Sequence, residues 1–73
     1  MATNSLDNRG LAPPEPMVRI LEAVQSLQGG DQLDVLMDRE PLLLYPELER
    51  RGLSWEFSDR DGGDFLLVIR RVT

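Results

Sequence analysis

Apolar residues recur along this chain with two different periods, and the change of period predicts the secondary structure. In residues 17–27 the apolar positions are three and four residues apart, which predicts an amphipathic helix with one buried face. These positions are Met17, Ile20, Leu21, Val24 and Leu27. Gly29 and Gly30 follow them and predict the end of the helix, because glycine readily adopts the positive φ common at helix C-termini.

Three other segments alternate with a period of two and predict strands. Leu33, Val35 and Met37 predict one strand, Leu53, Trp55 and Phe57 predict a half-buried one, and residues 65–71 predict the last. Residues 5–7 are a shorter candidate, ahead of the turn signal in residues 8–10. Residues 59–64, rich in aspartate and glycine, predict a hairpin turn.

Residues 38–52 predict a second helix. Asp38 or Glu40 can cap it, Pro41 suits its first turn, and Gly52 ends it. We expect its apolar side to consist of residues 42–45 and Leu48. Pro46 has no N–H, so this segment either kinks there or splits into a short turn and a helix that begins near Tyr45.

The element order is therefore β-α-β-α-β-β. It predicts an α+β fold, a two-layer sandwich with two helices on one face of a four-stranded sheet, because each right-handed strand-helix-strand connection places its helix on the same side. At 73 residues the chain is expected to form one domain, residues 5–73, after a flexible tail of residues 1–4.

The composition of the chain excludes most kinds of catalytic and metal-binding site. The chain has no cysteine and no histidine, and its eight basic residues are all arginine. Thiolate nucleophiles, disulfides, Schiff-base lysines and soft-metal ligands are thus missing, and we expect neither an enzyme nor a bound cofactor. A net charge of −5 argues against nucleic acid and anionic lipid as partners. No apolar run approaches the length of a membrane span, and no secretory signal is visible in residues 1–4, so we expect a cytoplasmic protein.

A family resemblance is carried by three motifs. Leu6-Asp7, Gly10-Leu11, Pro14 and Pro16 resemble L-D-x-x-G-L-x-C-P-x-P, the signature of the TusA/SirA sulfur-carrier superfamily. Residues 30–33 resemble its G-E-x-L entry to strand two, and residues 38–41 its acidic residue and proline before helix two. The resemblance implies a mixed sheet whose last strand is antiparallel and lies between strands two and three.

The position of the reactive cysteine is the main departure from that signature, because Pro13 occupies it here. Sulfur transfer is therefore not carried over. The segment REPLLLYPELERRG is more similar still to a cysteine-less branch, the domain of unknown function numbered twenty-two forty-nine. Members of that branch have no assigned activity and also occur fused to other domains, hemerythrin-like ones among them.

The stretch LAPPEPM allows two interpretations. Pro14 and Pro16 fit a helix entrance, where N–H groups have no internal acceptor, and Glu15 places a carboxylate in the first turn. The stretch is then only a rigid helix start. Alternatively, the corner formed by Pro13, Pro14, Glu15, Pro16 and Met17 remains a docking surface for partners.

The last strand is apolar on both faces. Phe65, Leu67 and Ile69 fit the helix-facing core, which leaves Leu66 and Val68 on the other side of the sheet, with Leu36 as a further candidate there. An exposed apolar patch there would mark a protein partner or homo-oligomer interface. The alternative is that long neighbouring side chains cover a central strand.

Three further groups of residues are candidate ion sites. Arg50, Arg51, Arg70 and Arg71 form two doublets that could hold a small anion, although arginine at a helix C-terminus is also the ordinary dipole complement. DRDGGD resembles part of a calcium loop but lacks the glutamate at the twelfth place, so a plain turn is preferred. Asp31, Asp34 and Asp38 are a candidate magnesium or acid-base cluster. Asp34 and Asp38 share a strand face but lie about 13 Å apart, too far for one ion, so a solvated edge is preferred.

These observations favour a non-catalytic binding or regulatory module that acts through protein contacts. The alternative is an accessory protein of sulfur or redox metabolism that binds a small anion or thiol cofactor at the start of helix one.

Overall fold

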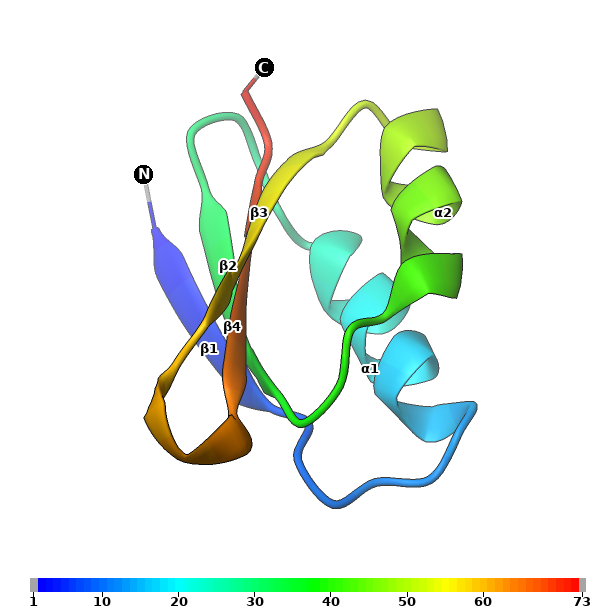
Figure 1. Cartoon of the computed structure of the whole chain (residues 1–73). Helices are drawn as coiled ribbons and strands as arrows, with labels where there is room; N and C mark the ends of the chain where they lie inside the picture. The colour runs from blue at the N-terminus through cyan, green and yellow to red at the C-terminus, as the bar shows by residue number, and fades with distance from the viewer. Residues whose placement is uncertain (1, 73) are drawn as a thin grey trace.

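A computed structural model describes residues 2–72, apart from the side chain of Asp61, and its elements follow the predicted order (Figure 1). The strands are β1 (Thr3–Asp7), β2 (Gln32–Met37), β3 (Ser54–Asp59) and β4 (Phe65–Arg70). The helices are α1 (Glu15–Val24) and α2 (Tyr45–Arg50), with single 3₁₀ turns η1 (Leu42–Leu44) and η2 (Asp61–Gly63). Both helices lie on one face of the sheet and the other face is open, which confirms the predicted two-layer α+β fold.

The sheet is mixed, in the order β1-β2-β4-β3. β1 runs parallel to β2, whereas β4 is antiparallel to both of its neighbours. The last strand thus lies between the second and third, as the family resemblance implies. Leu67 on β4 is in register with Val35 on β2 and Phe57 on β3, so this row crosses the centre of the helix-facing side.

The core lies between this face and the helices. Most of the apolar positions with helical or strand periodicity are buried there, which confirms the faces predicted for α1, β2 and β4. Two stacked aromatic pairs line its edge, Tyr45 on Trp55 with ring centroids 5.3 Å apart and Phe57 on Phe65 at 5.1 Å. The buried set is Ile20, Val24, Leu27, Leu33, Val35, Met37, Leu44, Leu48, Leu53, Leu67 and Ile69.

The proline-rich stretch forms the entrance of α1. Pro14 precedes the helix and Pro16 lies in its first turn, where the missing N–H groups have no intrahelical acceptor to lose. The Val18 N–H donates to the Pro14 carbonyl at 3.1 Å, and the Glu15 N–H donates to the Ala12 carbonyl at 3.0 Å. The predicted role of these prolines at a helix start is confirmed.

A buried asparagine fixes the loop between β1 and α1. The Asn8 side chain is 0% exposed and its Nδ2 donates to the Pro16 carbonyl at 2.9 Å, while its backbone N–H donates to the Leu36 carbonyl at 2.9 Å. The sequence pattern treats Asn8 only as part of a turn. In the structure it joins the end of β1 to the first turn of α1.

Two boundaries differ from the prediction. β1 begins at Thr3, inside the expected tail of residues 1–4, because Thr3 pairs with Gln32 and Asn4 with Leu33. α1 ends at Val24, before the glycines, and the chain continues in a tighter turn in which the Leu27 N–H donates to the Val24 carbonyl. Leu27 is still buried, so the predicted core position holds although the helix is shorter.

The segment around Pro46 splits, as the second of the two alternatives predicts. η1 ends at Leu44 and α2 begins at Tyr45, which puts Pro46 in the first turn of α2. Gly52 has a φ of 72° and ends the helical segment as expected. β3 then begins at Ser54, one residue later than the pattern suggests.

Asp31 holds both ends of the described chain at the edge where β2 begins. Its Oδ1 accepts a hydrogen bond from the Ala2 N–H at 2.9 Å, and its carbonyl accepts one from the Arg71 N–H at 3.1 Å. Hydrogen bonds to the carboxylate, mainly from the Gln28 N–H, lower the pKa of Asp31. Asp31 therefore connects both ends of the described chain to the start of β2.

Candidate functional site

An apolar groove of about 320 Å³ lies between the entrance of α1 and the η1 turn. One wall comes from the proline-rich stretch and the other from the segment that leads into α2, and Met37 at the end of β2 contributes to the lining. We call this hollow the proline groove. Its lining residues are Pro13, Pro14, Pro16, Met17, Met37, Arg39, Glu40, Pro41, Leu42, Leu43 and Leu44.

Two leucines of this groove project into solvent. Leu42 is 65% exposed and Leu43 is 82% exposed, whereas Leu44 is buried in the core. The prediction that residues 42–44 all form the apolar side of helix two is wrong on this point, because successive residues of a helical turn point in different directions and only one can face the sheet. Three consecutive leucines are the signal in the sequence that could have indicated an exposed apolar ridge.

The polar groups at the rim of the groove are few and already engaged. The Tyr45 hydroxyl donates to Glu40 Oε2 at 3.0 Å, and Arg39 forms an ion pair with Asp38, with Nε and Oδ1 3.5 Å apart. Asp38 in turn accepts a hydrogen bond from the Gly10 N–H at 2.8 Å, and this bond is the main cause of its lowered pKa. The rim therefore bears one basic and one acidic side chain beside an apolar floor.

The titration of Tyr45 tests its hydrogen bond to Glu40 at the rim of the groove. Burial, together with the hydrogen bond to Glu40 and its charge, raises the pKa of Tyr45 from 10 to about 12. Because the folded protein holds this proton more tightly than the unfolded chain, the contribution of Tyr45 to stability is present below pH 10 and is lost as the pH rises towards 12. Tyr45 is the only tyrosine, so the ultraviolet absorbance of phenolate reports it alone.

We expect the absorbance titration of folded protein to have its midpoint near 12. Glu40→Gln should lower this midpoint because the carboxylate charge is removed, without restoring the ordinary pKa since burial remains. A midpoint near 10 in the wild type would contradict the Tyr45–Glu40 contact.

The start of α1 retains few donors for an anion. Pro14 and Pro16 have no N–H, and the N–H groups of Glu15 and Val18 already bond to backbone carbonyls. Of the first four helical residues, only Met17 keeps an N–H without a backbone acceptor among the described residues. Glu15 adds a negative charge in this turn, which a helix N-terminus favours but a second anion would oppose.

The open face of the sheet carries the second predicted surface. Leu36 and Leu66 are neighbours in register on β2 and β4, and Val68 lies two residues along β4 on the same face. These residues lie on the face away from the helices, and all three are half-buried. Their role as an interface stays a prediction.

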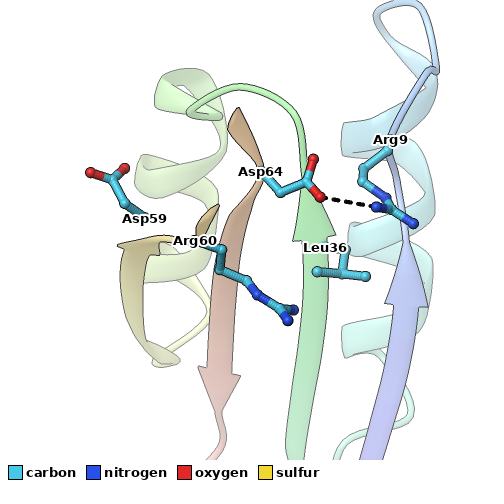
Figure 2. Close-up of a pocket in the computed structure, with 5 residues that line it drawn as sticks. All are labelled: Arg9, Leu36, Asp59, Arg60 and Asp64. Carbon is cyan, nitrogen blue, oxygen red and sulfur yellow. Dashed lines mark hydrogen bonds and ion pairs between the residues drawn. The ribbon is translucent and has the colours of Figure 1, made fainter. Parts of the chain in front are cut away.

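Two hollows meet at one end of this face, where both are lined by Leu36 and Arg60 (Figure 2). One of about 430 Å³ is bordered by Arg9 and Asp64, and the other of about 460 Å³ extends over Leu66. Figure 2 shows the Arg60 side chain reaching towards Leu36, whereas the Asp59 carboxylate points away.

Arg9 is neutralised by two carboxylates at this end. Its guanidinium lies 2.8 Å from Asp7 Oδ2 and 3.0 Å from Asp64 Oδ2, which ties β1 to the start of β4. The side-chain hydrogen bonds from Arg9 lower the pKa of Asp7 to about 2. Sequence patterns could not pair these residues, because Arg9 and Asp64 are 55 positions apart.

Three of the four arginines proposed as an anion patch have side-chain partners within the chain. Arg50 and Arg51 both pair with Glu47 on α2 and thereby lower its pKa. Arg70 instead donates to Gln32 Oε1 at 3.1 Å on β2. The patch remains a prediction.

The aspartates proposed as ion ligands lie in the β3–β4 hairpin and along β2 or at its ends. Within residues 2–72, Asp61 side chain excepted, no group of three or more acidic side chains is placed to hold a metal ion. The Arg60 N–H donates to the Asp64 carbonyl at 2.8 Å and closes the hairpin, with positive φ at Gly62 and Gly63. In the same part of the chain, no helix is long and apolar enough to cross a membrane.

Comparison with known proteins agrees with the fold. A family described as "Uncharacterized conserved protein (DUF2249)" matches residues 5–71. The chain belongs to the DUF2249 family. The crystal structure of a SirA-like protein from Desulfitobacterium hafniense is similar to this DUF2249 domain, with 28% identity and a TM-score of 0.77 over 94% of this chain and 95% of that one. No curated protein matches the sequence at a significant level.

The resemblance to the TusA/SirA superfamily is thus confirmed for this DUF2249 domain. In the superfamily signature the reactive cysteine corresponds to Pro13, and Pro13 lines the proline groove.

Proposed function

We propose that this DUF2249 domain is a non-catalytic binding module, and that a protein partner places an apolar segment in the proline groove. One observation carries the proposal. Leu42 and Leu43 line the groove and also project from η1 into solvent, so a hollow and an exposed apolar ridge form one surface. Exposed apolar surface of this kind is typical of interaction sites.

The shape of this surface favours a protein partner over a small-molecule ligand. A small ligand in the hollow would contact Leu43 but leave much of that side chain in water, because it is 82% exposed. A second protein surface can fill the hollow and cover the ridge at the same time, which removes more apolar area from water. The lining includes one basic and one acidic side chain, Arg39 and Glu40, so their opposite charges do not oppose an apolar occupant.

The side chains at the groove support binding without catalysis. The sequence has no thiol and no imidazole, and the hydroxyl of Tyr45 is held by Glu40 with its pKa raised to about 12. A hydroxyl nucleophile at neutral pH is favoured by a lowered pKa, whereas the pKa of Tyr45 is raised. The alternative of a small anion at the start of α1 is less well supported, because prolines replace two of the donors there.

Leu43→Asp is the variant that tests the groove. Peptides selected by display against the wild-type domain, with counter-selection against this variant, are expected to be rich in apolar residues. The affinity of a selected peptide should fall by about tenfold or more in Leu43→Asp, because a buried contact is replaced by a desolvated charge.

Val72→Asp is the matched control, since Val72 is also apolar and exposed but does not line the groove. It should bind the selected peptide as the wild type does. Failure to enrich any peptide that distinguishes Leu43→Asp from Val72→Asp would contradict the proposal. Circular dichroism of both variants shows whether the fold is intact, which is expected because each replaced side chain is largely in solvent.

A further inference from the structure

We infer that the open face of the sheet is a second docking surface, distinct from the proline groove, and that it fits a segment carrying a basic side chain next to apolar ones. We call Leu36, Leu66 and Val68 the open-face island. This inference does not depend on the groove, because the island lies on the face of the sheet that the helices do not cover (Figure 1).

The island provides an apolar floor of defined shape. Leu36 and Leu66 lie side by side in register, and the hollow of about 460 Å³ passes over both of them. Leu67 and Ile69, the alternating residues of β4, are 0% exposed in the core, whereas the island residues are only half-buried. No other element of the described chain lies over them.

Two carboxylates stand on either side of Val68. The register places Asp34 of β2 and Glu56 of β3 directly opposite Val68, one on each neighbouring strand. With strands about 4.8 Å apart, their α-carbons are about 10 Å apart with only the valine between them. Asp34 accepts a hydrogen bond from Gln32 Nε2 at 2.8 Å, but within the described residues neither carboxylate forms an ion pair.

This arrangement contrasts with Asp7, the other carboxylate of the face. Arg9 neutralises Asp7 from within the chain, whereas among the described residues no arginine forms an ion pair with Asp34 or Glu56. Arg70, two residues along β4 from Val68 on the same face, donates to Gln32 instead. Cross-strand neighbours of opposite charge stabilise sheets, so two acidic neighbours around one apolar residue leave a position that a cation from outside can complete. The net charge of −5 also attracts cationic partners.

The chemistry of the occupant follows from this layout. The methylene stem of a lysine or arginine can lie on Val68 while its charged head reaches between Asp34 and Glu56. Apolar neighbours in the same segment would then cover Leu36 and Leu66. Arg60 reaches towards Leu36 at the opposite end of the island, so the basic side chain must enter at the Val68 end (Figure 2). An amphipathic helix with this stripe would supply the third layer that the sheet lacks.

The test uses a synthetic helical peptide with a leucine stripe flanked by lysines, and a second peptide with glutamates in place of the lysines. We expect the lysine peptide to bind and to shift the amide resonances of β2, β3 and β4, and the glutamate peptide to bind much more weakly. The double variant Asp34→Asn/Glu56→Gln should lose about tenfold in affinity for the lysine peptide, with a weaker dependence on salt.

The matched control is Glu22→Gln/Glu49→Gln, which removes the same charge from exposed positions on the helix layer. Equal loss of affinity in both double variants, no binding of the lysine peptide, or shifts confined to the proline groove would overturn the inference. Leu43→Asp should bind the lysine peptide like the wild type, so failure of the groove proposal and failure of this one give different results.

Discussion

Leu67→Ala is expected to remove most of the free energy of unfolding of the protein at room temperature. Leu67 is 0% exposed and lies at the centre of the core face, in register with Val35 and Phe57. Truncation of a buried leucine costs about 2–5 kcal/mol through lost burial and the cavity that remains. A single core in a domain of this size supplies only about 3–5 kcal/mol of net stability. Urea denaturation followed by the fluorescence of Trp55, the only tryptophan, measures the change.

Leu66→Ala is the matched control on the same strand. The same substitution one residue earlier falls on the open face, where the side chain is only half-buried, and should cost about 1 kcal/mol. Similar losses for the two variants would show that the two faces of β4 are not distinguished as described.

Asn8→Ala is expected to have the second largest effect, a loss of about 1–3 kcal/mol. The substitution removes a buried hydrogen bond from Nδ2 to the Pro16 carbonyl and leaves a cavity where the amide packed. Because this bond joins the end of β1 to the first turn of α1, backbone amides of residues 9–18 should also exchange with deuterium faster than in the wild type.

Thermal unfolding and hydrogen exchange measure the two parts of this prediction. Asn4→Ala serves as control, because Asn4 is exposed on β1 and the same atoms are removed without a buried partner. If Asn8→Ala were no less stable than Asn4→Ala, the Asn8 side chain would not anchor the loop.

The regular elements could be predicted because their apolar periods match their buried faces. Val35 and Leu67 recur at every second position, and Ile20 and Val24 at helical spacing, so each segment indicated its own element and its own buried side. The order of the strands needed the family resemblance, since a period of two does not reveal which strand lies next to which. The boundaries were less certain: Thr3 joined β1 through pairing with Gln32, which no local pattern signals.

The candidate surfaces were only partly predictable. The corner at Pro13 and Pro16 was identified as a docking alternative from the sequence, but its second wall was not, because the ridge of Leu42 and Leu43 depends on how η1 turns against the sheet. Asn8 was missed for a different reason. Asparagine is usually exposed in turns, and only the meeting of β1, β2 and α1 buries it here.

The hydrogen bonds to Asp31 determine from which end of the domain its two termini leave. Because Ala2 and Arg71 are both tied to this residue at the start of β2, whereas Met37 at the far end of the same strand lines the proline groove, anything joined before Ala2 or after Val72 departs from the opposite pole. A biotin tag or a neighbouring domain at either terminus therefore leaves the groove unobstructed. Immobilised on a biosensor chip through a biotin tag at either terminus, the domain would present the groove to the flowing sample.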